Sequence, residues 1–71
     1  MDVDLSNLDE KIRFDVKLQI SLYKTAEKVM REDKREEFEN YMQERINKIR
    51  EILGLREHFR IFEDEKLIFE V

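Results

Sequence analysis

Cysteine and proline are absent from this chain of 71 residues, and glycine and histidine each occur once. Without cysteine no disulfide and no thiolate zinc site can form, and a single histidine does not support a conventional structural metal site. A single glycine also excludes the glycine-rich loops that cradle phosphates. We therefore expect no cofactor and no metal, and we expect a reducing, cytoplasmic compartment.

Long apolar runs are missing as well. No stretch approaches the roughly 20 residues of a membrane span, and the acidic start Met1-Asp2-Val3-Asp4 lacks the basic and apolar regions of a signal peptide. We therefore expect no membrane association. A chain of this length forms one domain with a thin core, for which association between chains is a common source of stability. We accordingly expect a homodimer.

Charged residues make up 45% of the chain, a composition like that of thermophile proteins, and the net charge is −4. The charge is unevenly distributed. Residues 1–10 carry four acids and no base, whereas residues 11–34 carry seven bases and four acids. Overall acidity argues against non-specific binding to nucleic acid, but a local basic face can still attract it.

Residues 12–22 alternate apolar and polar side chains at all eleven positions. Strict alternation is typical of a half-buried β-strand, and several of the apolar members are β-branched or aromatic. In a helix the same apolar residues would spread over about two-thirds of the circumference, which is a poor amphipathic pattern. We therefore predict a strand that ends before Ser21, a good N-cap for a following helix.

The ten residues before this segment are predicted to form a loosely held acidic arm with Leu5 and Leu8 as its anchors. Asn7 followed three residues later by Glu10 resembles a capping box. A helix that begins there is therefore the competing interpretation of the N-terminal region.

After the predicted strand the apolar period becomes helical and predicts a first helix over 22–31. Residues 32–37 contain no apolar side chain, and a second helical stripe runs over 38–53. No glycine or proline separates the stripes. The sequence leaves open whether 22–53 forms two helices or one long kinked helix.

Both ends of the second helix carry end signals, which place it at 36–53. Asp33 followed by Glu36 resembles a capping box at its start. Gly54 is a natural left-handed residue just after a helix, and Leu55 behind it can make the usual hydrophobic contact.

Two short aromatic and β-branched runs, 59–62 and 67–71, flank the acidic segment 63–66 and predict a β-hairpin. The element order is then β-α-α-β-β, which makes this a small single α+β domain. Within the domain 1–71 we expect three parts: an acidic arm at 1–10, a strand-helix-helix unit at 11–53 and a hairpin at 55–71.

The sequence contains few residues that could form a catalytic site. The hydroxyl candidates besides the tyrosines are Ser6, Ser21 and Thr25, and the only possible histidine base, His58, lies far from all three in sequence. The acidic clusters lack the spacing of a calcium loop. We therefore do not expect an enzyme.

The polar residues of the predicted strand would form a row on its solvent face: Arg13, Asp15, Lys17 and Gln19. Such side chains can hydrogen-bond base edges, with Arg or Lys on guanine, Gln on adenine and Asp on cytosine. Alternatively, the row is simply the solvated face of an antiparallel sheet.

The order of basic strand, short helix and longer helix resembles the ribbon-helix-helix family of dimeric repressors and antitoxins. The resemblance runs from Arg13-Phe14-Asp15-Val16-Lys17-Leu18 through the helix 22–31 and the junction Asp33-Lys34-Arg35 to residue 49, about half the chain. In that family two protomers pair their strands in the major groove of DNA, and the start of the second helix clamps a phosphate.

The resemblance implies that Arg13, Asp15 and Lys17 read bases and that Lys34 and Arg35 lie near the phosphate clamp. It implies a small dimeric DNA-binding transcriptional regulator or antitoxin. Because antitoxin-like members carry extensions that grip a toxin, the C-terminal segment could bind a protein partner.

The second helix itself points to association. Residues 36–53 would span about 27 Å at 1.5 Å per residue, more than short strands can cover, so the apolar stripe needs another chain. The candidate residues for a dimer or partner interface, or for the core, are Phe14, Val16, Leu18, Phe38, Tyr41, Met42, Ile46, Ile49 and Leu53. The alternative function is a dimeric protein-interaction module, an adaptor or inhibitor without nucleic-acid binding.

Overall fold

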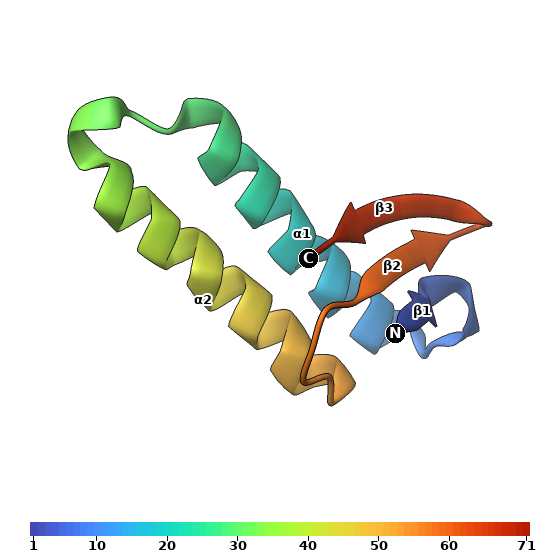
Figure 1. Ribbon diagram of the computed structural model, residues 1–71. Helices are drawn as coiled ribbons and strands as arrows, with labels where there is room; N and C mark the ends of the chain where they lie inside the picture. Colours follow the sequence, from blue (N-terminus) through green and yellow to red (C-terminus); the bar gives the residue numbers. More distant parts are fainter.

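A helical hairpin packed on one side against a small sheet makes up the computed structural model, which describes all 71 residues (Figure 1). The helices are α1 (Glu10–Val29) and α2 (Arg35–Leu53), and the strands are β1 (Asp2–Asp4), β2 (Arg60–Glu63) and β3 (Lys66–Glu70). Two 3-10 turns, η1 (Leu5–Asn7) and η2 (Glu32–Lys34), follow β1 and precede α2. The α+β class and the order β-α-α-β-β agree with the sequence prediction, although the first strand is a different segment.

The segment 12–22, predicted as a strand, lies inside α1, so that prediction is wrong. The helix begins just after Asp9, whose side chain accepts a hydrogen bond from the backbone N–H of Lys11. Glu10 places an acid in the first turn, where the helix dipole favours it. The competing interpretation, a helix beginning between Asn7 and Glu10, is therefore closer to the structure.

The alternating pattern fits a helix for a simple geometric reason. Residues two apart point to nearly opposite sides of a helix, and residues four apart share a side. Val16 and Ile20 form one stripe, which is buried in the core. Phe14 and Leu18 form the other, and their side chains remain 64% and 43% exposed. A strictly alternating segment can thus be a helix with two apolar sides.

Residues 22–53 form two helices rather than one. The chain leaves the helical conformation at Met30 and passes through η2, which buries no side chain, before α2 begins. The predicted cap at Asp33 is not made: the N-cap is Lys34, without a side-chain hydrogen bond, and the Asp33 carboxylate accepts hydrogen bonds from Arg31 instead.

The other end of α2 is as predicted. Gly54 adopts a left-handed conformation with φ 68°, which L-residues reach only with strain. Its backbone N–H donates to the carbonyl of Arg50, and Leu55 is buried directly behind it.

The predicted C-terminal hairpin is confirmed, with a tighter turn than expected. Glu63 and Lys66 pair with each other, so only Asp64 and Glu65 form the turn, both at positive φ. Positive φ at both central residues is typical of the type I′ turns that suit the strand twist. The pairing register of the two strands shifts between Ile61 and Phe62.

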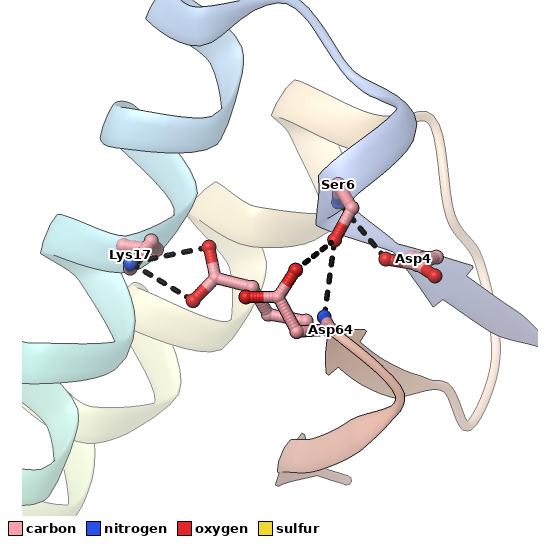
Figure 2. Close-up of polar contacts among 5 residues, drawn as sticks. Asp4, Ser6, Lys17 and Asp64 are labelled. Atoms are coloured by element: carbon pink, nitrogen blue, oxygen red, sulfur yellow. Dashed lines mark hydrogen bonds and ion pairs between the residues drawn. The ribbon is translucent and has the colours of Figure 1, made fainter.

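The N-terminal residues are part of the sheet rather than a loose arm. β1 pairs in parallel with β2, which gives the strand order β1-β2-β3, and Leu5 is completely buried. Figure 2 shows how the following turn is fixed: Ser6 contacts the Asp64 carboxylate at 3.2 Å, and the Ser6 hydroxyl accepts from the Asp64 backbone N–H at 3.0 Å. The turn after β1 and the turn of the C-terminal β-hairpin therefore stabilise each other.

The core lies between the sheet and the half of the helical hairpin nearest to it (Figure 1). The loop end of the hairpin extends beyond the sheet, and only Ala26 and Met42 are buried between the helices there. The buried core cluster consists of Leu5, Val16, Ile20, Ile46, Ile49, Leu55, Phe59, Ile61 and Phe69. Neither helix is long and apolar enough to cross a membrane.

Candidate interaction surface

The side of the helical hairpin away from the sheet is rich in exposed apolar side chains. We define this open face by five residues, Phe14, Leu18, Leu22, Phe38 and Tyr41. The first three follow each other at four-residue spacing on α1, so they share one side of that helix. Phe14, Leu18 and Tyr41 are among the most exposed large apolar residues of the chain.

A shallow groove of about 350 Å³ lies on the open face between the two helices. Leu22, Thr25 and Ala26 line it from α1, and Glu37, Phe38 and Tyr41 line it from α2. It is mainly apolar, and nothing in the chain covers it. A groove of this shape accepts apolar side chains from a facing helix.

Arg45, which lies against the groove residue Tyr41, already has partners within the chain. The Arg45 guanidinium donates to Gln19 at 3.2 Å and lies 4.8 Å from the centre of the Tyr41 ring. It also lies 3.6 Å from the Glu44 carboxylate. Because these contacts replace water, covering Arg45 with another chain costs less than covering an unpartnered charge.

The predicted interface residues divide between two places. Val16, Ile46 and Ile49 belong to the core cluster, Leu53 packs against it, and Met42 is buried between the helices. Phe14, Leu18, Phe38 and Tyr41 belong to the open face instead. Sequence analysis missed Leu22, although its spacing from Phe14 and Leu18 would have revealed it once a helix was assumed.

The predicted DNA-reading residues do not form one row. Arg13 and Lys17 share a side of α1 at four-residue spacing, whereas Asp15 lies on a different side of that helix. Lys34 and Arg35 lie at the loop end of the helical hairpin, just before α2 and at its first residue. The strand that the ribbon-helix-helix resemblance requires is helical in this structure.

Two of these residues are engaged in ion pairs. Lys17 donates to both oxygens of Glu63, at 2.9 and 3.2 Å. Arg35 donates to Glu39 at 2.7 Å and to Glu32 at 3.2 Å, and the hydrogen bond to Glu39 is the main reason that the pKa of Arg35 is raised. All three carboxylate partners belong to the chain itself.

Titratable groups do not gather into a reaction centre. The groups with a shifted pKa are Asp2, Arg35 and Arg60, and all lie in exposed ion pairs. The His58 ring places Nδ1 3.1 Å from the carbonyl oxygen of Val71, at the base of the hairpin. No three His, Cys, Asp or Glu side chains lie close enough together to hold a metal ion.

Comparisons of the chain with protein-family models, with curated proteins and with solved structures find no match.

Proposed function

We propose that the protein is a homodimeric interaction module whose two copies associate through their open faces. The observation that carries this proposal is the second apolar stripe of α1. Phe14 and Leu18 face away from the core cluster, and no element of the chain packs over them. Apolar side chains gathered on one side of a helical hairpin favour burial against another chain.

The size of the open face suits a dimer. α1 has 20 residues, so it is about 30 Å long at 1.5 Å per residue. Two helices packed about 9 Å apart present a face about 20 Å wide, which gives a flat area of about 600 Å². Projecting side chains increase the accessible area above this value. Stable interfaces bury about 800 Å² from each partner, a value that the open face approaches.

A second copy fits this face by symmetry. A twofold axis parallel to the helices would set α1 of one copy over α2 of the other and keep both loop ends at the same level. Leu22 of one copy would then lie at the level of Tyr41 of its partner, and Leu18 and Phe14 would contact the part of the partner's α2 nearer the sheet. The result would be a four-helix bundle with a sheet on each outer side. A cytoplasmic location is part of this proposal, because the chain has no cysteine.

The experiment measures molar mass in solution by light scattering and sedimentation for the wild type, Leu18→Glu and Tyr41→Glu. We expect the wild type to have twice the chain mass of 8.8 kDa. Both variants should be monomeric, because each would bury a charge at the apolar interface. The melting temperature of the wild type should also rise with protein concentration, as it does when folding and association are coupled.

Leu67→Glu is the matched control, because Leu67 is 49% exposed but lies on β3, outside the open face. This variant should remain dimeric. A wild type that stays monomeric at high concentration would refute the proposal. Equal loss of association in all three variants would place the interface elsewhere.

A further inference from the structure

A second concave surface lies between α1 and the β-hairpin formed by β2 and β3. We call it the lysine groove; its volume is about 410 Å³. Ile20 and Ile68 provide the apolar part of its lining. The remaining lining residues are polar or charged: Lys17, Ser21, Lys24, Thr25, Lys28 and Glu63.

Two of the three lysines form no ion pair with a carboxylate of the chain. Lys17 is neutralised by Glu63, the one carboxylate of the groove, and Figure 2 shows both contacts to the Lys17 ammonium. Lys24 donates to the carbonyl oxygen of Ile68 at 2.8 Å, which positions its ammonium but leaves its charge intact. Lys28 forms no ion pair within the chain.

The cations follow a regular line along the helix. Ser21, Lys24 and Lys28 are spaced by three and four residues, so a hydroxyl and two ammonium groups share one side of α1. Arg13 and Lys17 extend this side toward the N-terminus. From Arg13 to Lys28 the line spans about 22 Å at 1.5 Å per residue. An elongated line of cations matches an extended polyanion better than a single small anion.

We propose that the lysine groove binds the phosphodiester backbone of a nucleic acid, with Lys24 and Lys28 on phosphate oxygens and Ser21 as an additional donor. Lysine and serine side chains are common phosphate contacts, and such contacts position a protein without reading sequence. The acidic remainder of the chain opposes this contact less as salt rises, because charges more than about 10 Å away are largely screened at 0.1 M. The groove borders the open face, since Thr25 lines both grooves, but Lys24 and Lys28 are not among the open-face residues.

The test is fluorescence anisotropy with labelled duplex and single-stranded oligonucleotides across a salt series. We expect binding at low salt, and log affinity should fall linearly with log salt as counterions are released. The double variant Lys24→Gln/Lys28→Gln should bind about tenfold more weakly, and the magnitude of its salt slope should fall by about 2. The control Lys34→Gln/Lys48→Gln removes the same charge from outside the groove and should bind like the wild type.

Lys24 also supports β3 through Ile68, so Lys28→Gln alone provides a variant that leaves this contact intact. Circular dichroism of every variant checks the fold. No binding at low salt would overturn the proposal, as would equal losses in the groove and control variants. Binding of inorganic phosphate or of anionic lipid vesicles without binding of oligonucleotides would also overturn it, in favour of a small-anion or membrane site.

Discussion

The two halves of the helical hairpin are built from the same helices but are stabilised differently. The half beside the sheet contains the core cluster, in which Val16 and Ile49 are completely buried. The loop half buries only Ala26 and Met42, and the connecting turn buries nothing. Helix propensity alone rarely holds a short helical hairpin, since most helical stability comes from packing. The comparison indicates that the sheet stabilises one half, whereas the loop half depends on the contact between its two helices.

The largest effect should come from breaking the sheet-covered half. Phe59 is 1% exposed, and its ring lies 6.3 Å from that of Phe69. Phe59→Ala should lower the free energy of unfolding by about 3–5 kcal/mol, because a large cavity would open at the centre of the core. Urea denaturation followed by circular dichroism measures this loss. A loss below about 1 kcal/mol would show that Phe59 is not central to folding.

How much of this fold the sequence could predict depends on how local each signal is. Gly54 and the hairpin runs were predicted correctly, because a left-handed helix end and a β-turn are specified by neighbouring residues. The strand at 12–22 was wrong, because alternation fits both a strand and a helix with two apolar sides. The packing of α1 against α2 distinguishes the strand from the helix. Such tertiary contacts override local propensity, so the pattern of the segment alone could not decide between them.

Contacts between the ends of the chain could not be predicted. β1 is three residues long, and its parallel pairing with β2 joins residues nearly sixty positions apart, such as Val3 and Ile61. The lysine groove depends on the same kind of contact, since Lys17 meets Glu63 only after folding. Four of the five open-face residues, by contrast, were already contained in the predicted interface list. The apolar residues of the open face can be recognised from the sequence itself, whereas their exposure depends on how the whole chain folds.

A smaller loss is expected in the loop half. Met42→Ala should cost about 2 kcal/mol, at the low end for buried methionine, because the helices beside it can close toward each other. Hydrogen exchange should show that amides near Met42 exchange through local openings, at a lower free energy than those near Ile49. Equal protection of both halves in a monomeric variant such as Leu18→Glu would contradict the comparison.

The smallest effect concerns the ion pair that fastens β1 to the sheet. Arg60 donates to the two oxygens of Asp2 at 2.9 and 2.8 Å, and these hydrogen bonds hold the pKa of Asp2 below its ordinary value. A carboxyl group whose pKa is lower in the folded state stabilises the fold above its unfolded pKa, about 3.9. This stabilisation is lost as the pH falls through the pKa that Asp2 has in the folded protein.

Asp2→Asn should therefore be slightly less stable than the wild type at neutral pH, and the difference should vanish in acid below the folded pKa. Urea denaturation at a series of pH values measures both curves. Glu57→Gln is the control, because Glu57 is exposed and takes part in none of the ion pairs of the chain, and its curve should run parallel to that of the wild type. If the gap between wild type and Asp2→Asn stayed constant with pH, charge pairing would not be what holds β1. The anchoring of the sheet-covered half would then have to come from Leu5 and from the backbone pairing of β1 with β2.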